Sequence, residues 1–290
     1  MIERDLRIRI GTDARRVAEL ALAEDGPRDI TTDVTISPGQ GGTGAIEFRT
    51  AGVLAGTPYA DAVASAAGLP SITWYHAPGS AVAAGATAGL VRGDLAKILV
   101  AERPLLNLLQ RAVGIATLTH AFVERVKHTR AQILHTRKTA PGLRLLDVSS
   151  VLAGGGHAHR LDLAGTVMVK DNHWRGLERS GRPLRDALRT AREAGAARCY
   201  VEVETLEQLA LACEAGADRL LIDNQTPATV HAWAARALTL SRDIEIEATG
   251  GITLENVAAY ADAGADFISI GALTHSVAAA DVALEIRDEI

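Results

Sequence analysis

The later part of the chain alternates strand-like and helix-like patterns. Short apolar runs occupy residues 131–134, 166–169, 199–203, 219–222, 244–247 and 267–270. Between them, apolar residues recur at helical spacing over 142–152, 183–194, 205–215, 227–238 and 253–263. Strands that alternate with helices predict βα units around a parallel sheet.

A polar residue or a glycine follows each apolar run. These positions are Thr136, Lys170, Glu202 or Glu204, Asp223, Thr249 and Gly271. In an α/β barrel the loops after all strands converge on one mouth, whereas an open doubly wound sheet gathers functional residues at one switch point. The spread over successive strand ends therefore predicts a barrel with its site at the carboxyl ends of the strands.

The first part of the chain lacks a single repeating period. Its pattern predicts a helix over 12–24 with Asp13 as a cap, two short strands within 43–56, a helix over 58–67 and a strand over 71–76. Strands and helices in this irregular order indicate a small α+β domain.

A long helical pattern joins the two parts between residues 94 and 127. We expect a helix boundary at Ala101–Pro104, because a helix interior excludes proline, and another near Gly114.

Composition limits the classes of function. The chain has 290 residues, of which 48% are hydrophobic and only 3% aromatic, so the core must be mainly aliphatic. A net charge of −5 argues against a general nucleic-acid or membrane binder. Cys199 and Cys213 lack metal-type spacing and are expected to be reduced core residues. With a charged N-terminus and no apolar run of membrane-spanning length, we expect a cytoplasmic protein.

Cations gather between residues 135 and 173. Arg137, Lys138, Arg160 and Lys170 have no matching acidic run nearby. Such side chains are rarely buried without a partner, so the cluster predicts a ligand with several negative charges. The adjacent Gly154–Gly156 lacks the spacing of a dinucleotide or P-loop motif.

Two further groups complete the candidate chemistry. Glu202 and Asp223 could hold Mg²⁺, bind sugar hydroxyls or stabilise a developing positive charge, or they could only pair with nearby lysines. Thr249–Gly251 and Gly271–His275 follow the last two strands, where barrels commonly bind phosphate at helix N-termini.

Ordered motifs along nearly the whole chain carry a family resemblance. They are Ala101–Arg103, Gly114–Thr117, Thr136–Thr139, Pro141–Arg144, Gly154–Gly156, His159-Arg160, Lys170–His173, Val201–Glu204, Asp223-Asn224, Gly250–Ile252 and Gly271–His275. In these motifs the chain resembles the nicotinate-nucleotide pyrophosphorylases, also called quinolinate phosphoribosyltransferases. The resemblance implies an N-terminal α/β sandwich over 1–112, joined by a C-terminal helix over 277–290, and an incomplete α/β barrel over 113–276.

The resemblance also implies an activity. Quinolinate and phosphoribosyl pyrophosphate would give nicotinate mononucleotide, pyrophosphate and CO₂, with Mg²⁺ and no organic cofactor. The assembly would be a homodimer or a hexamer of dimers, with no nucleic-acid or membrane partner.

By position, the resemblance assigns roles to individual residues. Arg103 would enter the partner subunit's site; Arg137, His159 and Arg160 would clamp the quinolinate carboxylates. Lys138, Lys170, Glu202 and Asp223 would be catalytic, with the two acids also holding the metal. Thr249, Gly250, Gly251 and Gly271 would cradle the 5′-phosphate, and Thr136, Met168 and His275 would also bind substrate.

Several positions depart from the family pattern. His135, Arg28 and Gly165 stand where Asp, Gly and Asp are common, Val113 replaces a serine, and Thr249 is a mild change from serine. Because His135 would alter the charge beside the pocket, a paralogue acting on another heteroaromatic acid stays open.

Other interpretations remain. A Schiff-base aldolase would use Lys138 or Lys170 as its nucleophile, and a catalytically silent barrel would only bind phosphorylated metabolites. The intact Lys170–His173 motif disfavours the related molybdenum-transport-associated group.

Overall fold

The computed structural model describes residues 2–287, with side chains from residue 6 onward. The chain divides into two compact units. The first consists of the chain up to His120, Lys138–Gly155, and the chain from Ala272 onward; the second consists of Ala121–Arg137 and Gly156–Gly271. The first unit thus extends beyond the boundary expected at residue 112 and also takes back the segment that begins with Lys138.

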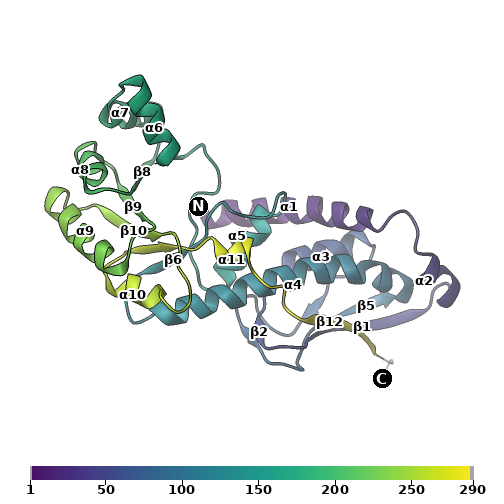
Figure 1. Cartoon of the computed structure of the whole chain (residues 1–290). Helices are drawn as coiled ribbons and strands as arrows, with labels where there is room; N and C mark the ends of the chain where they lie inside the picture. Colours follow the sequence, from purple (N-terminus) through teal and green to yellow (C-terminus); the bar gives the residue numbers. More distant parts are fainter. Residues whose placement is uncertain (1, 288–290) are drawn as a thin grey trace. The chain divides into compact units, whose positions relative to one another are not determined.

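The first unit combines an antiparallel sheet with helices (Figure 1). Its strands lie in the order β12 (Val282–Arg287), β1 (Gly41–Phe48), β5 (Thr87–Asp94) and β3 (Thr73–Trp74), and β2 (Gly52–Val53) pairs with β4 (Ala81–Val82). The helices are α1 (Ile2–Glu24), α2 (Ile30–Thr35), α3 (Thr57–Ala66), most of α4 (Leu95–Val126), α5 (Arg144–Ala153) and α11 (Ala272–His275).

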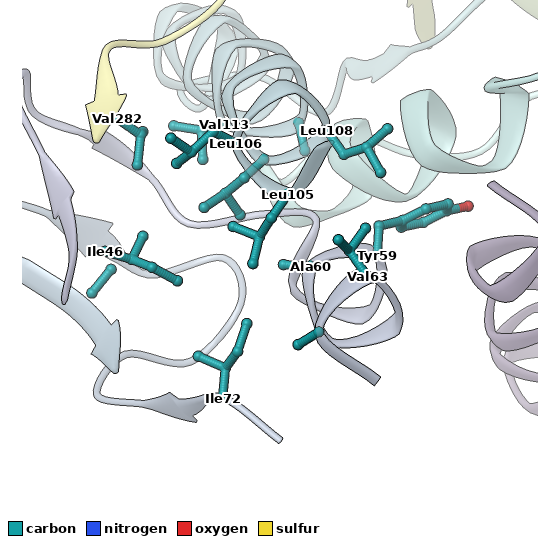
Figure 2. Close-up of a cluster of buried hydrophobic side chains, with 14 of the residues drawn as sticks. Ile46, Tyr59, Ala60, Val63, Ile72, Leu105, Leu106, Leu108, Val113 and Val282 are labelled. Atoms are coloured by element: carbon teal, nitrogen blue, oxygen red, sulfur yellow. The ribbon is translucent and has the colours of Figure 1, made fainter. Parts of the chain in front are cut away.

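The core of the first unit is aliphatic, as the composition predicts. Figure 2 shows Leu105 and Leu106 of α4 among side chains from the sheet and α3, including Ile46 and Val63. The fully buried Tyr59 carries its hydroxyl at the edge of this cluster and donates to Asp13 at 2.8 Å. Asp13 therefore lies inside α1 as a hydrogen-bond acceptor, and the prediction that it caps a helix is wrong.

Helix α4 continues through both positions where we expected it to end. Pro104 lies within the helix, where its missing N–H would have donated to the carbonyl of the exposed Val100. Gly114 allows a close backbone approach, because a Cβ atom there would overlap the carbonyl oxygen of Ala278. The carbonyl one turn before Pro104 therefore belongs to an exposed residue, Gly114 lies at a close packing contact, and neither position is a helix boundary.

Residues Val282–Arg287 form a strand, so the prediction of a helix over 277–290 is wrong for the described residues, and positions 288–290 lie outside them. In β12, Val282 and Leu284 are buried and alternate with more exposed residues. They pair with Phe48 and Ile46 of β1. The edge of β1 satisfies the backbone hydrogen bonds of this short segment. Pairing there favours the alternating, two-residue side-chain pattern of a strand over the pattern of a helix.

The second unit contains the predicted parallel sheet (Figure 1). Its order is β6 (Gln132–Leu134), β11 (Phe267–Ser269), β10 (Glu245–Thr249), β9 (Arg219–Asp223), β8 (Arg198–Val203) and β7 (Thr166–Val169). The helices are α6 (Asp171–Ser180), α7 (Leu184–Glu193), α8 (Leu206–Glu214), α9 (Pro227–Leu240) and α10 (Val257–Asp262). The first strand of this unit, β6, pairs in parallel with the last, β11, which gives the expected barrel-like order. Because β6 and β7 are the two ends of the sheet, the barrel is open.

Among residues 2–287, no helix is both long and apolar enough to cross a membrane. Sequence reasoning missed α6, because its residues are mostly polar and only Trp174 is buried. The cysteines lie where we expected them, since Cys199 and Cys213 are buried and free.

The close approach at Gly114 gives a test of helix packing. Gly114→Ala should lower the free energy of unfolding by roughly 1–3 kcal/mol, the range for inserting atoms into a packed contact. Gly11→Ala in α1 is the matched control, since a Cβ atom there meets nothing within 4 Å. The control should stabilise by about 0.5–1 kcal/mol through lower backbone entropy. Urea unfolding checks both, and equal stabilisation by the two changes would contradict the packing role.

Candidate functional site

The carboxyl ends of the parallel strands bring together most of the predicted side chains. Glu202 lies in β8 and Asp223 ends β9, while Lys170 directly follows β7. Thr249 ends β10 and is in register with Asp223. Because all these strands are parallel, the residues share one edge of the sheet.

Lys170 and Glu202 form an ion pair at this edge. Glu202 is buried, whereas the Lys170 side chain is 44% exposed. The indole of Trp174 donates to the Glu202 carbonyl at 2.8 Å and so fixes the end of β8 against α6. The Glu202 carboxylate engages the amine of Lys170, whereas a Schiff-base nucleophile needs an amine that is free to attack a carbonyl. The pair therefore disfavours the aldolase interpretation at Lys170.

Asp223 extends this cluster. Burial raises the pKa of its carboxyl group, the negative charge of Glu202 raises it further, and the charge of Lys170 opposes both. Asn224 donates to Asp223 at 2.6 Å. Two carboxylates that repel each other next to one lysine attract a further positive charge.

The loop after β10 is shaped by glycine. Gly250 has a φ of +85°, and a Cβ atom there would overlap the side-chain oxygen of Asn224. The N–H of Asn224, itself at a φ of 53°, donates to the carbonyl of Thr249 at 2.9 Å. Gly251 also has a positive φ. This contact requires glycine at position 250.

The expected helix N-terminus at this loop is absent from the described chain. Helix α10 begins only at Val257. Asn256 instead holds a turn, since its side chain accepts from the N–H of Thr253 at 2.8 Å and donates to the carbonyl of Gly251 at 3.0 Å. Any phosphate contact here therefore depends on loop N–H groups rather than on the end of α10, and α11 after Gly271 is a four-residue helix.

Arg137 and Arg160 form the cationic part of the site. The Nε atoms of both are buried and have no hydrogen-bond partner among the described residues. Burial lowers the pKa of Arg160, and the charge of Arg137 lowers it further. One Nη atom of Arg160 donates to the carbonyl of Thr166 at 3.3 Å. Two like charges with unpartnered N–H groups make a strong site for an anion with more than one acceptor.

The imidazoles of His135 and His159 are both engaged by the protein. His135 is fully buried; its Nδ1 lies 3.0 Å from the Thr136 carbonyl, and its Nε2 accepts from the His159 N–H at 2.9 Å. His159 Nδ1 accepts from the Arg160 N–H at 2.7 Å, and Nε2 lies 3.2 Å from Glu247. A ring that accepts a backbone N–H is neutral, so His135 places no charge at the position where the family pattern has an aspartate.

Three of the predicted residues belong to the first unit. Lys138 is exposed and adjoins Arg137 in sequence. Arg103 on α4 is 59% exposed and lies 3.9 Å from Glu102. His275 ends α11 and its ring contacts the Ser276 hydroxyl. In the second unit, Met168 lies half-buried in β7.

Sequence reasoning missed the residues that hold the Lys138 loop. Arg111 donates twice to the fully buried Asp147 at 2.7 Å and once to the Thr274 carbonyl at 2.9 Å. The Thr274 hydroxyl donates to the Lys138 carbonyl at 2.8 Å, and Asp147 also accepts from the Ala140 N–H at 3.1 Å. The available signal was an acid, Asp147, between the apolar Leu146 and Val148 of a predicted helix.

The other residues that depart from the family pattern lie in ordinary surface or core environments. Arg28 is exposed and pairs with Asp33, while Asp29 caps α2 through the Thr32 N–H. Gly165 has open space where a Cβ atom would lie. Val113 is fully buried in the core of the first unit.

The second unit is therefore an open α/β barrel with a dicationic anion site and a lysine–carboxylate cluster at one edge. Comparisons with known proteins agree with this class and define it further. The sequence matches the family model "Quinolinate phosphoribosyl transferase, C-terminal domain" over residues 115–285 and the corresponding N-terminal domain over 29–113. The chain belongs to the quinolinate phosphoribosyltransferase family.

Similar proteins are found across distant organisms. The nicotinate-nucleotide pyrophosphorylase (carboxylating) of Mycobacterium leprae is 38% identical over 94% of this chain and 97% of the relative. The human protein of that name is 37% identical over 83% of this chain and 81% of the relative. The solved nicotinate-nucleotide pyrophosphorylase of Francisella tularensis superposes with a TM-score of 0.85 at 30% identity, over 96% of this chain and 97% of that one.

The repulsion between Arg137 and Arg160 predicts that the site costs stability. Arg137→Met should raise the free energy of unfolding by about 0.5–2 kcal/mol, as for other site residues kept for function, because it removes a buried unpartnered N–H and one of two like charges. Thermal unfolding in a buffer without multivalent anions measures the change. Destabilisation by more than about 1 kcal/mol would show that Arg137 has a structural partner.

Proposed function

We propose that this protein transfers the phosphoribosyl group of phosphoribosyl pyrophosphate to quinolinate and releases pyrophosphate and CO₂, giving nicotinate mononucleotide. The observation that carries the proposal is the pair Arg137 and Arg160, two half-buried cations whose buried Nε atoms have no hydrogen-bond partner among the described residues. Quinolinate presents two adjacent carboxylates, and arginine binds each with directed N–H groups. Family membership fixes the reaction class, and the arginine pair fits the acid.

The carboxylate cluster fits the glycosyl transfer. As the bond to pyrophosphate lengthens, the ribosyl carbon gains positive charge, which Glu202 and Asp223 stabilise. Two lysines supply positive charge for the anionic substrates. They are Lys170, which pairs with Glu202, and Lys138, whose carbonyl accepts a hydrogen bond from Thr274. The ring nitrogen then takes the ribosyl group, and its new positive charge accepts the electron pair released when the adjacent carboxylate leaves as CO₂.

Mg²⁺ suits the same acids. Glu202 and Asp223 supply oxygen ligands. Burial raises the pKa of Asp223, and the negative charge of Glu202 raises it further, so a cation bound between the two acids would relieve their repulsion. A bound Mg²⁺ would neutralise pyrophosphate oxygens. The described residues contain no group of three or more acidic, histidine or cysteine side chains arranged for a metal, so substrate oxygens and water would complete the ion's coordination.

The remaining predicted residues are assigned to other parts of the substrates. We place the 5′-phosphate against the loop N–H groups at Thr249–Gly251 and Gly271. Thr136, Met168 and His275 would line the remaining path. Arg137 and Arg160 provide the acid clamp, with His159 beside them.

We further propose a cytoplasmic homodimer or a larger assembly of dimers. The buried free cysteines suit a reducing compartment. Arg103 is exposed on α4, as an arginine that enters a partner subunit's site must be before assembly.

Turnover of quinolinate tests the function directly. Purified protein with quinolinate, phosphoribosyl pyrophosphate and Mg²⁺ should release CO₂ and form nicotinate mononucleotide. Arg137→Ala and Arg160→Ala should each weaken acid binding by roughly 2–5 kcal/mol, the cost of truncating one partner of a buried charge pair. Isothermal titration with quinolinate measures the loss.

Two outcomes would count against this assignment. Turnover of a different pyridine acid, but not of quinolinate, would support a paralogue with another substrate. Ligand binding without any release of pyrophosphate would indicate a silent binding protein.

Subunit mixing tests the proposed role of Arg103. Arg103→Ala and Lys138→Ala should each be nearly inactive alone, but mixed dimers should regain part of the activity because one of the two sites then holds both native residues. The measurement is specific activity against mixing ratio, with native mass spectrometry to verify exchange. Mixed dimers that stay inactive would place Arg103 in its own subunit's site or outside any site.

A further inference from the structure

The open side of the barrel depends on a segment that is not a regular strand. Residues 157–160 begin beside β6, where the His157 N–H donates to the Ile133 carbonyl at 2.8 Å and His157 forms a parallel bridge with Leu134. Because β6 is an end of the sheet, the following residues lack a neighbouring strand of the regular ladder. Their backbone N–H groups donate to side chains instead.

Two imidazoles accept these N–H groups. His135 Nε2 accepts from His159, and His159 Nδ1 accepts from Arg160. Since a backbone N–H can only donate, each accepting nitrogen carries no proton. The ring proton of His135 therefore lies on Nδ1 and points to the Thr136 carbonyl, whereas that of His159 lies on Nε2 and points to Glu247. The geometry requires two neutral rings with opposite tautomers.

Glu247 anchors the inner end of this chain of hydrogen bonds. It is fully buried, and burial raises its pKa, but the hydrogen bond from His159 and the charge and hydrogen bond of Arg219 lower the pKa overall. Arg219 donates to the same carboxylate oxygen at 2.9 Å. The Arg219 guanidinium is itself held over the ring of Phe267, 3.6 Å from its centroid.

The chain of contacts ends at Arg160, whose buried Nε has no hydrogen-bond partner among the described residues. We propose that His135, His159 and Glu247 are positioning residues that fix the backbone at Arg160 and so hold its guanidinium ready for a substrate carboxylate. This inference rests on the proposed function, in which Arg160 binds the acid. It assigns His159 a supporting role, since both of its ring nitrogens are occupied by protein atoms and its side chain is only 6% exposed.

The neutral ring of His135 matters for the charge of the site. An aspartate at this position would also accept an N–H, but it would bring a carboxylate next to the segments that carry Arg137 and Arg160. That carboxylate would compete with the substrate for the arginines. Imidazole satisfies the backbone without adding a negative charge, so the change at His135 is compatible with a dicarboxylate substrate.

The tautomers give a test on the unmodified protein. Long-range ¹H–¹⁵N spectra of the full chain should show His135 protonated at Nδ1 and His159 protonated at Nε2. Backbone amides of His159 and Arg160 should exchange slowly with solvent, although they lie outside a regular strand. An Nε2–H tautomer of His135, or fast exchange at both amides, would overturn the proposal.

A matched pair of substitutions isolates the acceptor at His135. His135→Gln and His135→Met have similar length, and both lose the bond to the Thr136 carbonyl. Only glutamine supplies an oxygen near the position of Nε2, whereas the methionine sulfur is a weak acceptor. In His135→Met, amide exchange at His159 and the KM for quinolinate should each rise about tenfold. The KM for phosphoribosyl pyrophosphate should change less than about twofold, and His135→Gln should stay near wild type in all three.

The outcomes separate this inference from the proposed function. Equal behaviour of the two variants in both exchange and KM would overturn the positioning role, as would a rise of both KM values together, which a general loss of structure produces. If the wild type failed to use quinolinate, the proposed function would fall. The tautomers and the exchange difference would then still decide whether the histidines hold Arg160.

Discussion

The mutual repulsion of Arg137 and Arg160 is the constraint on which the second unit depends. Two half-buried arginines whose buried Nε atoms have no hydrogen-bond partner among the described residues do not stabilise their own position. The backbone must therefore hold them from behind. At Arg160 this support comes from the imidazoles of His135 and His159, with Glu247 at the inner end. These hydrogen bonds fix the backbone that carries Arg160 without occupying its Nε atom.

A similar division between support and chemistry occurs in the first unit. Lys138 is exposed, but its loop is tied down by the Thr274 hydroxyl and by Asp147, which Arg111 holds with two hydrogen bonds. Asp147 is completely buried and cannot reach a ligand in solvent. The acid is present in the sequence as part of a helix, and only its partners show that it organises the loop.

The errors of the sequence analysis have a common origin. Proline and glycine at positions 104 and 114 normally indicate helix ends, yet α4 passes through both because one carbonyl is exposed and one backbone contact needs space. Asp13 has the chemistry of a cap but accepts from Tyr59 inside a helix. The segment of β12 is a strand because β1 offers it a sheet edge. In each case a contact between distant residues overrides a local preference.

The sequence by itself determined the alternation of strands and helices, and with it the parallel sheet and the polar residues at its carboxyl edge. It also carried the motifs of the family, because these lie in short continuous segments. Tertiary structure alone decided that Lys170 pairs with Glu202, that His135 is neutral, and that the Nε atoms of Arg137 and Arg160 have no hydrogen-bond partner among the described residues. The physical reason is that charge, tautomer and hydrogen-bond satisfaction depend on neighbours in space, which a residue's place along the chain does not specify.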